Sequence, residues 1–515
     1  MARRGIVAAA LFTAVALLVP VAGGDAPAEA RPRPPRLLAL HAEPDPVHGG
    51  RIVDARGRHV LLRGVNVNAY AEYWPGTAFP TTFPLTADDA DRIAGIGWNA
   101  VRLLVSWSRV EPAPGRYDEE YLDTIERAVD LLAARGVYSI IDLHQDAWGP
   151  TLAARPGEVC PAGSPPALGW DGAPGWATLD GGAPRCAVAG IRELSPAVRA
   201  AFGAFWADAP GPGGVGIRTR YVHMLGHLAA RFARTEAVAG YDVMNEPNAF
   251  GDAEHRALGD LYEQALAAVR AAERDRRGRP HLLLFEPPAL WSSTGSGPPP
   301  DFRRDRDVVY APHVYTGGFT GGPITRDAFQ VAIDEARTFG GAPVLSGEWG
   351  ADPGRAEPGG DGYFLEHQRL QDEVRVSATL WTWRESCGDP HKVADLRAGR
   401  VPEVWGEFEV DCRTNAVSGV RQALVDQLSR GYVRAAPGRL VRTSWAPAAR
   451  RLRAAGAAAD RGVELVAFSP VPRDELRARA TGLRHLRLRR APGGGTFVTA
   501  RAGGGHWSLR VAPRG

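Results

Sequence analysis

The sequence predicts an α/β protein, a (β/α)8 TIM barrel followed by a small C-terminal antiparallel β-sandwich domain. Short apolar runs alternate with amphipathic helical stretches through residues 47–430. Over residues 431–515 the pattern changes to short β-like runs separated by Gly and Pro turns. A doubly wound open sheet is the alternative, but it would carry a glycine-rich turn after its first strand, where this chain has Asn66-Val67-Asn68.

Residues 1–30 are typical of a secretory signal peptide. A short basic start precedes an apolar run, and Ala28-Glu29-Ala30 has the small-x-small form of a cleavage site. A retained membrane anchor is the alternative, but the run ends without a basic stop-transfer cluster. We therefore expect a secreted, extracellular protein whose mature chain begins with a Pro-rich linker over residues 31–46.

Eight apolar runs predict strands that are buried on both faces, as in a parallel sheet. They are Leu61–Val67, Ala100–Trp107, Tyr138–Asp142, Ala239–Met244, His281–Phe285, Val308–Val314, Pro343–Gly347 and Ala378–Trp383. Helical patterns lie between them, among them Glu119–Ala134, Arg218–Phe232, His255–Glu273 and Tyr363–Val374. In the C-terminal domain the clearest β patterns are Val463–Phe468, His485–Arg489, Gly495–Ala500 and Trp507–Val511.

The chain has four cysteines, an even number that favours two disulfides in an exported protein. Three connectivities are open from the sequence alone, and we expect near neighbours to pair, Cys160 with Cys186 and Cys387 with Cys412. Each bridge would contribute about 3 kcal/mol by restricting the unfolded chain. A zinc site is the alternative, but the sequence has no CxxC spacing to support it.

Polar residues end six of the predicted barrel strands, at the edge where barrel active sites form. In chain order these residues are Arg102, His144 and Asp146, Asn245 and Glu246, His313 and Tyr315, Glu348, and Trp381. Glu246 and Glu348 follow the fourth and seventh strands, so they face each other across one mouth. Any single member could be structural, for example Glu348 as an ion-pair partner of Arg102, but their joint occurrence indicates a catalytic site.

A facing pair of carboxyl groups suits hydrolysis of a glycosidic bond. One protonates the leaving oxygen and the other attacks the anomeric carbon, with about 5–5.5 Å between them when configuration is retained. We expect the charge of Glu348 to raise the pKa of Glu246. Arg102, His144 and His313 can hydrogen-bond to the carboxylates, Tyr315 can touch the nucleophile, and Trp381 can form an apolar floor for a sugar.

With Asn245-Glu246-Pro247 after strand four and Glu348 after strand seven, the barrel resembles glycoside hydrolase family 5 over about residues 50–430. The resemblance implies that Glu246 is the acid/base and Glu348 the nucleophile. It also implies that Asn245 holds the sugar 2-hydroxyl and that Arg102 sits beneath the nucleophile. By the same resemblance, the first sugar site is lined by His144, His313, Tyr315 and Trp381.

Three further motifs resemble the endoglycosylceramidase branch of that family, Asp142–Asp146, Gly172–Thr178 and Tyr241–Pro247. The branch releases an intact sugar chain from ceramide, which implies that Asp146 and Trp176 contact sugar. Broad-specificity members carry a lysine shortly after strand one that contacts glucose. Here that region has Asn68, Tyr70 and Glu72, and the only lysine is Lys392. This departure counts against glucose-linked gangliosides and leaves galactosylceramide-type and other lipid-linked substrates open.

The insertion after strand three, from Trp148 to Phe205, and the residue that follows it are rich in aromatic side chains. They are Trp148, Trp170, Trp176, Phe202, Phe205 and Trp206. An exposed aromatic rim would suit a ceramide tail or a membrane surface. The alternative is a loop that packs its own small core, pinned by the Cys160–Cys186 bridge.

Two other classes of protein are open. A polysaccharide endohydrolase of the β-glucanase or β-mannanase type would need no lipid groove, and a non-catalytic glycolipid-binding barrel would have lost a glutamate. The net charge of +3, from 61 basic and 58 acidic residues, gives no reason to expect a nucleic-acid partner. We expect a monomer that needs no cofactor or metal. Its partners would be a glycolipid or oligosaccharide and, transiently, a membrane or micelle surface.

Overall fold

The computed structural model describes residues 34–514, so the predicted signal peptide and the first residues of the predicted linker lie outside the described residues. Within that range the predicted barrel is confirmed. Eight parallel strands form one sheet in the order β10-β11-β4-β5-β6-β7-β8-β9. Their bounds are β4 Arg63–Tyr70, β5 Ala100–Val105, β6 Tyr138–Leu143, β7 Val238–Asp242, β8 Leu282–Phe285, β9 Val308–Tyr310, β10 Leu345–Ser346 and β11 Ser377–Leu380. A parallel bridge between Tyr310 and Val344 closes the sheet between β9 and β10.

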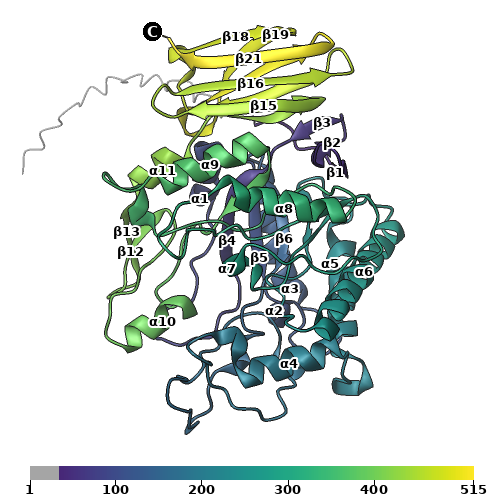
Figure 1. Ribbon diagram of the computed structural model, residues 1–515, viewed down its shortest axis with the longest axis vertical. Helices are drawn as coiled ribbons and strands as arrows, with labels where there is room; N and C mark the ends of the chain where they lie inside the picture. Colours follow the sequence, from purple (N-terminus) through teal and green to yellow (C-terminus); the bar gives the residue numbers. More distant parts are fainter. Residues whose placement is uncertain (1–33, 515) are drawn as a thin grey trace, which may run out of the picture. The chain divides into compact units, whose positions relative to one another are not determined.

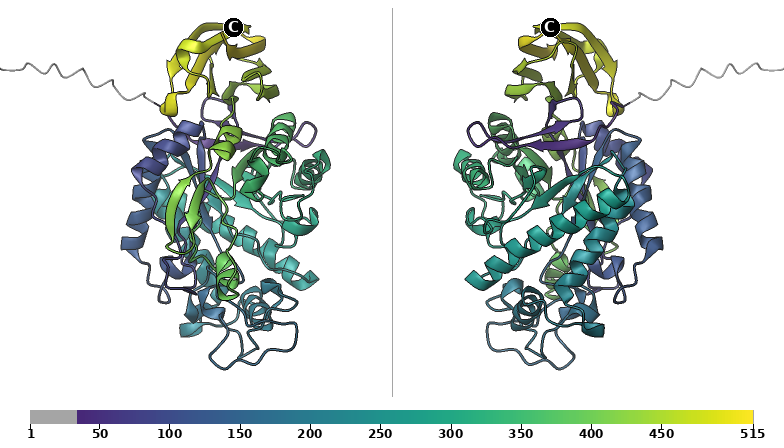
Figure 2. Two further views of the ribbon diagram at one scale, coloured as in Figure 1. Left: turned by 90° about the vertical axis from the view of Figure 1, so that its left-hand side faces the viewer. Right: turned by 90° about the vertical axis from the view of Figure 1, so that its right-hand side faces the viewer.

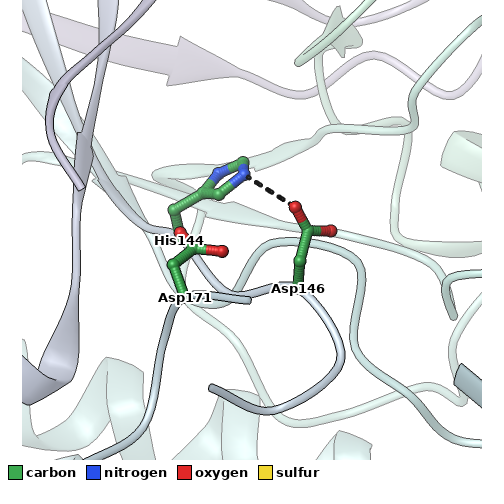
Figure 3. A group of neighbouring side chains, drawn as sticks. All are labelled: His144, Asp146 and Asp171. Atoms are coloured by element: carbon green, nitrogen blue, oxygen red, sulfur yellow. Dashed lines mark ion pairs between the residues drawn. The ribbon is translucent and has the colours of Figure 1, made fainter. Parts of the chain in front are cut away.

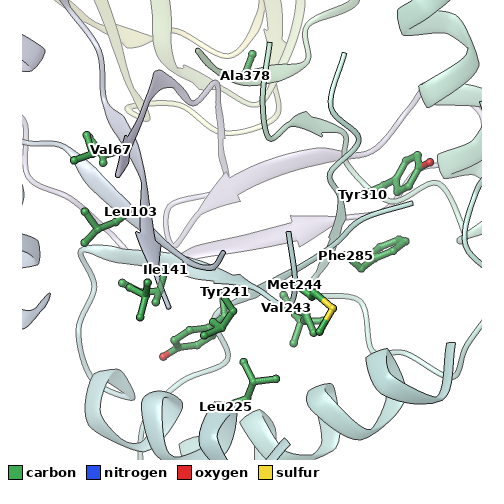
Figure 4. Packing of buried hydrophobic residues seen from close by; sticks show 14 of the residues in the cluster. Val67, Leu103, Ile141, Leu225, Tyr241, Val243, Met244, Phe285, Tyr310 and Ala378 are labelled. Atoms are coloured by element: carbon green, nitrogen blue, oxygen red, sulfur yellow. The ribbon is translucent and has the colours of Figure 1, made fainter. Parts of the chain in front are cut away.

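The helices cover the outside of the barrel (Figure 1). Their bounds are α1 Ala87–Ile96, α2 Trp107–Val110, α3 Glu119–Ala133, α4 Pro196–Trp206, α5 Ile217–Phe232, α6 Asp252–Asp275, α7 Trp291–Thr294, α8 Arg326–Thr338, α9 Tyr363–Val374, α10 Pro390–Arg397 and α11 Gln422–Leu428. Figure 4 shows how strand and helix side chains meet, with Leu103 of β5 and Ile141 of β6 in the same buried cluster as Leu225 of α5. The strands are buried on both faces, which is why each was a continuous apolar run.

The C-terminal domain packs two antiparallel sheets against each other. One has the order β15-β16-β21-β18, and the other has the order β1-β2-β3-β14-β17-β20-β19. The C-terminal strands are β14 Tyr432–Pro437, β15 Arg439–Ala446, β16 Arg451–Ala458, β17 Glu464–Ser469, β18 Leu476–Thr481, β19 Leu483–Arg490, β20 Thr496–Ala502 and β21 Gly505–Pro513. Buried side chains such as Phe468, Phe497 and Leu509 form the core between the sheets.

Three strands of the larger sheet come from the N-terminal part of the chain, which corrects two expectations. They are β1 Leu40–Glu43, β2 Arg51–Asp54 and β3 Arg58–Val60. Strand β3 pairs antiparallel with β14, with Val60 opposite Ala435. Residues 40–43 are therefore strand and not linker, and the sandwich is not built from residues 431–515 alone. Alternating apolar residues such as Leu40 and Ala42 are buried in a cluster that includes Ala100 and Leu345 near the start of barrel strands.

The aromatic insertion lies at the end of the barrel away from the sandwich, where α4 is labelled (Figures 1 and 2). Its side chains face inward. Phe202 and Phe205 of α4 are fully buried and contact the ring of Trp148. The exposed aromatic rim, one of the two possibilities open from the sequence, is therefore wrong. The second possibility, a core of the loop's own, is not what forms either, because these rings join the main barrel core and contact Trp107 and Tyr221. Tertiary contact decided the outcome, because aromatic content does not tell which way a side chain points.

Both predicted disulfides are present, Cys160–Cys186 within the insertion and Cys387–Cys412 beyond β11. The second bridge joins the loop after β11 to the turn of a short hairpin, β12 Phe408–Asp411 and β13 Ala416–Val420. In the part of the chain that the structure describes, no helix combines the length and apolarity that a membrane span requires.

Candidate active site

The two predicted catalytic glutamates lie together at the mouth of the barrel. Glu246 follows β7 and Glu348 follows β10, and a carboxylate oxygen of each lies within 4.8 Å of the other and of a ring nitrogen of His313. Glu348 is the more buried, with 8% of its side chain exposed against 19% for Glu246. The structure therefore holds one carboxylate deep in the site and the other nearer to solvent.

Arg102 lies beneath Glu348 and joins the ends of several strands. Its guanidinium is fully buried and donates to Glu348 Oε1 at 2.8 Å. It also donates to the side-chain oxygens of Asn66, Asp142, Asp242, Asn245 and Glu286, at 2.9 to 3.1 Å. On its other oxygen, Glu348 accepts a hydrogen bond from the Tyr315 hydroxyl at 2.9 Å. Two donors thus hold the Glu348 carboxylate in one orientation.

The carboxyl groups around Arg102 exceed the single positive charge that it supplies. Burial raises the pKa of Asp142 to about 7 against the opposing charge of Arg102. Burial likewise raises the pKa of Glu286 to about 7 and that of Asp242 to about 6. Burial lowers the pKa of Arg102 less than these carboxylates raise it, and its pKa lies well above the ordinary value. The cluster keeps Arg102 charged and shares protons among its acids.

His313 bridges the two glutamates. Its Nδ1 lies 2.9 Å from Glu246 Oε1 and 3.6 Å from Glu348 Oε2, and its Nε2 forms an ion pair with Glu286 Oε1 at 3.2 Å. Burial alone would lower the pKa of this imidazole, but the charges of Glu286 and Glu348 raise it well above its ordinary value. His313, with its pKa raised in this way, lies within one hydrogen bond of Glu246.

The expected raised pKa of Glu246 is wrong for the enzyme in this structure. Burial does raise it, but the hydrogen bond from His313, the charge of His313 and the charge of Arg192 together bring the pKa below its ordinary value. The repulsion from Glu348 on which we based the expectation is outweighed by a cation placed between the two acids. The sequence pattern predicted that His313 lies near the two acids, but it could not give the distance between His313 and Glu246.

The backbone at Glu246 adopts an unusual conformation that its neighbours stabilise. Its φ is +37°, a region that non-glycine residues rarely occupy. Glu286 Oε2 accepts from the Glu246 N–H at 2.8 Å, and Gln145 Nε2 donates to the Glu246 carbonyl at 2.9 Å. Such strain persists where surrounding contacts over-determine the geometry, as at catalytic turns. These contacts fix the direction in which the Glu246 side chain leaves the strand.

Other predicted residues line the same mouth. His144 Nδ1 lies 2.7 Å from Asp142 Oδ2, and burial lowers the pKa of His144 to about 4, so the ring is neutral. The indole of Trp381 stacks on this imidazole with ring centroids 5.5 Å apart. Asp146 accepts a hydrogen bond from Arg192 at 2.6 Å. Together these groups present polar edges and one flat apolar face to the site.

Two buried acids, Asp146 and Asp171, lie next to His144 (Figure 3). His144 Nε2 is 3.8 Å from Asp146 Oδ2, and a carboxylate oxygen of Asp171 lies within 4.8 Å of both. Among the described residues, neither oxygen of Asp171 has a hydrogen-bond partner. We predicted no metal, yet these three residues have donors that a divalent cation could use, as do Glu246, His313 and Glu348. In the second group, Arg102 and Tyr315 already occupy the oxygens of Glu348.

One predicted sugar contact is not brought to the catalytic pair. Trp176 donates its indole N–H to the carbonyl of Glu111 at 3.0 Å, and its ring contacts that of Trp107 at 5.3 Å. The remaining predicted residues, Arg102, His144, Asp146, Asn245, His313, Tyr315 and Trp381, lie around the pair or touch residues that do.

Sequence reasoning missed Glu286 as a member of the site. It directly follows β8 and contacts Arg102, His313 and the backbone of Glu246. The signal that could have found it was the one used for the other strands, a polar residue at the end of the fifth apolar run. Arg192 was also missed. It reaches Asp146 from the insertion, where no strand end marks it.

An aromatic patch adjoins Glu348 through Tyr315. Phe319 stacks on Tyr315 with centroids 4.3 Å apart, and the Trp405 ring lies 6.0 Å from that of Phe319. Phe319 is 59% exposed, which is unusual for so large an apolar side chain. We refer to Tyr315, Phe319 and Trp405 as the mouth patch.

A closed (β/α)8 barrel that carries two facing glutamates, one bound by Arg and Tyr and the other by His, defines a glycoside hydrolase. Residues 53–386 match the family model described as Cellulase (glycosyl hydrolase family 5). The chain belongs to this family.

The chain is similar to several proteins that have been named for glycolipids. It is 29% identical over 288 residues to endoglycoceramidase I of Rhodococcus hoagii (strain 103S), a match that covers 52% of each protein. The match therefore spans about half the length of this curated relative. Among solved structures, endogalactoceramidase aligns with a TM-score of 0.80 at 36% identity and covers 92% of this chain and 99% of that one. A ganglioside GM3 complex of endo-glycoceramidase II from Rhodococcus sp. aligns with a TM-score of 0.68 at 25% identity, covering 90% and 99%.

Proposed function

We propose that this protein is a secreted, retaining β-glycosidase that hydrolyses the bond between a sugar chain and a ceramide-type lipid. The observation that carries the proposal is the pair Glu246 and Glu348, because a carboxylate oxygen of one lies within 4.8 Å of a carboxylate oxygen of the other. Retaining enzymes hold their carboxyl groups about 5–5.5 Å apart and inverting enzymes about 6.5–9.5 Å apart. The glycolipid substrate is supported by the relatives that bear endoglycoceramidase and endogalactoceramidase names.

The reaction runs in two displacements. Glu348 Oε attacks the anomeric carbon while the bond from that carbon to the aglycone oxygen breaks, and Glu246 gives its proton to this oxygen. Water then attacks the same carbon, Glu246 takes a proton from it, and the bond to Glu348 breaks. Arg102 and Tyr315 stabilise the Glu348 carboxylate as it leaves.

His313 supplies the proton that Glu246 needs for the first displacement. The imidazole holds the proton in the free enzyme, and its Nδ1 is 2.9 Å from Glu246 Oε1. A sugar bound over the pair would exclude water from Glu246 and favour its neutral form. The proton then moves from Nδ1 to Oε1, which leaves a neutral imidazole and a carboxylic acid.

The mouth patch is the surface we assign to the lipid. It adjoins the nucleophile through Tyr315, and Phe319 is exposed, whereas the aromatic residues of the insertion are mostly buried. Each methylene buried against such a surface contributes about 0.8 kcal/mol. The same patch could touch a micelle or membrane surface transiently while a substrate molecule enters the site.

The test of the proposed reaction is product analysis with a small panel of substrates. Lactosylceramide, galactosylceramide, a nitrophenyl lactoside and a cellulose oligomer are incubated with the enzyme, and products are identified by mass spectrometry. We expect an intact sugar chain and free ceramide, with a higher kcat/KM for ceramide-linked substrates than for the others. Equal values for ceramide-linked and cellulose-type substrates would favour the endohydrolase alternative. The absence of any product, with substrate bound, would favour the non-catalytic one.

Retention is tested separately. Proton NMR of the first product should show the anomeric configuration of the substrate, and Glu348→Ala should lose several orders of magnitude in turnover. Azide should partly restore the variant by forming an α-glycosyl azide. A first product of inverted configuration would contradict the double displacement.

The lipid assignment is tested with Phe319→Ala. Truncation of this ring should lower kcat/KM about fivefold to thirtyfold for the ceramide-linked substrate that the panel shows to be cleaved and leave the nitrophenyl glycoside of the same sugar unchanged, because about 1–2 kcal/mol of apolar contact is lost only with the lipid. Leu486→Ala is the matched control, since Leu486 is an exposed apolar residue of the C-terminal domain. Equal losses on both substrates would remove the mouth patch from the lipid site.

Export and assembly state belong to the same proposal. The signal-like start predicts that protein recovered outside the producing cell begins near Arg31 and is a monomer in gel filtration. N-terminal sequencing that finds Met1 on the extracellular protein would contradict cleavage.

A further inference from the structure

A second hollow lies on the flank of the barrel, away from the catalytic glutamates. Its volume is about 800 Å³, within the range of small-molecule sites. Its walls come from α1, from the β12–β13 hairpin and α11, and from turns of the C-terminal domain near Trp445, Pro470 and Gly493. In the described part of the chain, the lining of this hollow includes none of the catalytic residues named above.

Glu407 is the unusual residue in this wall. It is 1% exposed, and within the described part of the chain neither of its carboxyl oxygens has a hydrogen-bond partner. Its backbone is fixed, because its N–H donates to the Trp383 carbonyl at 3.1 Å and its carbonyl accepts from the Arg421 N–H at 2.9 Å. A buried polar group without hydrogen-bond partners destabilises the folded state. A carboxyl kept at that cost, in the wall of a hollow, indicates a ligand that hydrogen-bonds to it.

Aromatic rings line the same hollow. Trp445 is partly exposed there, and Trp383 and Phe408 form the wall beneath. The indole N–H of Trp383 donates to Asp89 at 3.1 Å, so this ring is fixed and its nitrogen is occupied. The hollow therefore offers flat apolar faces next to a carboxyl group. That combination matches a ligand with one apolar face and several hydroxyl groups.

The charges at the rim favour a neutral ligand. Asp88 pairs with Arg92 at 3.0 Å, and Asp426 accepts a hydrogen bond from Gln422 at 2.7 Å. Arg450 adds a second guanidinium to the wall. The rim thus carries both positive and negative charges, and Asp88 and Asp426 already have polar partners. A cation or an anion would meet repulsion from one set, whereas hydroxyl groups can donate to the acids and accept from the arginines.

We infer that this hollow is a second, non-catalytic saccharide-binding site, in which a neutral sugar ring stacks on Trp445 and donates hydroxyl hydrogen bonds to Glu407. The inference is independent of the proposed reaction, because it concerns different residues and a binding event. Burial raises the pKa of Glu407 well above its ordinary value. A neutral carboxyl group can both donate to and accept from a sugar hydroxyl.

The test follows lactose binding to the full chain by the indole N–H signals of 15N-labelled tryptophans. We expect two binding events in the wild type, one that shifts the Trp381 signal and one that shifts the signals of Trp445 and Trp383. Trp383 lines the same hollow and reports on the second event in the Trp445 variants. Trp445→Ala and Glu407→Leu should weaken the second event about tenfold or more, a loss of about 1.4 kcal/mol, and leave hydrolysis of a nitrophenyl lactoside unchanged. Trp445→Phe keeps a stacking ring and should retain the second binding event.

Three outcomes would overturn the inference. One is that lactose binds to the wild type in a single event, which Trp381→Ala abolishes and Trp445→Ala leaves intact. Another is a Trp445 signal that does not move as lactose saturates the wild type, a measurement that needs no variant to fold. The third is a stronger response of Trp445 to ethanolamine than to lactose, which would make Glu407 a site for a cation.

Discussion

Glu286→Gln tests whether the site depends on the residue that sequence reasoning missed. The substitution keeps the shape of the side chain and removes its charge. Glu286 accepts from Arg102 on Oε1 and from the Glu246 N–H on Oε2. Glutamine has one acceptor oxygen, so its amide group must face either Arg102 or the Glu246 N–H, and both are donors. One hydrogen bond is therefore lost whichever way the amide turns.

The size of the effect follows from these contacts. Hydrogen bonds to charged groups contribute about 1.5–3 kcal/mol, which corresponds to roughly 10- to 150-fold in kcat/KM if the loss is felt in the transition state. The pH profile should move as well. Glu286 Oε1 lies 3.2 Å from His313 Nε2, so removal of its charge makes proton loss from the His313–Glu246 pair easier. The alkaline limb should shift to lower pH.

The assay is kcat/KM for a nitrophenyl lactoside across the pH range, with the melting temperature of each variant measured in parallel. Glu335→Gln is the matched control, because Glu335 is also a buried glutamate but bonds to Trp291 and Tyr310 away from the catalytic pair. A variant with kcat/KM within twofold of the wild type and an unmoved alkaline limb would refute the assignment of Glu286 as a positioning residue.

Three further outcomes are expected. Tyr315→Phe removes the hydroxyl that donates to Glu348 and should lower kcat/KM for a nitrophenyl lactoside about tenfold or more; a change below twofold would contradict this. Replacing Cys387 and Cys412 with serine opens a loop of sequence separation 25 and should lower the free energy of unfolding by about 3.5 kcal/mol in urea titrations, whereas equal midpoints would contradict it. Burial raises the pKa of Asp142 to about 7, above an unfolded value of about 3.9, so the folded state holds an extra proton between these pH values. The stability that Asp142 contributes therefore decreases as the pH rises from about 3.9 to about 7. Asp142→Asn should therefore flatten the dependence of unfolding free energy on pH between pH 5 and pH 7, and an unchanged slope would count against that pKa.

The parts of the fold that could be predicted were those whose residues are buried on both faces. β5 and β6 are continuous apolar runs for this reason, and their neighbours in the barrel share the pattern. β16 was not predicted, because alanine and arginine dominate its sequence and neither favours strands strongly. The pairing of β3 with β14 could not be seen either, since the two strands lie far apart in the chain.

For the site, strand ends located the acids and their polar neighbours but not the contacts between them. The direction of the Glu246 pKa depends on a 2.9 Å contact with His313, and the fate of Phe202 depends on which way α4 turns its faces. Both are properties of tertiary packing. Glu286 is different, because the rule that found Glu246 and Glu348 would have found it if applied to the fifth strand.

The pairing of β3 with β14 also has a consequence for how the protein is made. During synthesis, β1 to β3 emerge first, and their sheet cannot be completed until β14 follows, hundreds of residues later. The barrel lies between these two segments in the chain, so its first and last parts are tied together only when translation is nearly finished. Truncation at residue 430 would leave the edge of β3 and the apolar side chain of Leu61 without their partners. The two domains are therefore a single unit of biosynthesis, although the barrel alone carries the catalytic groups.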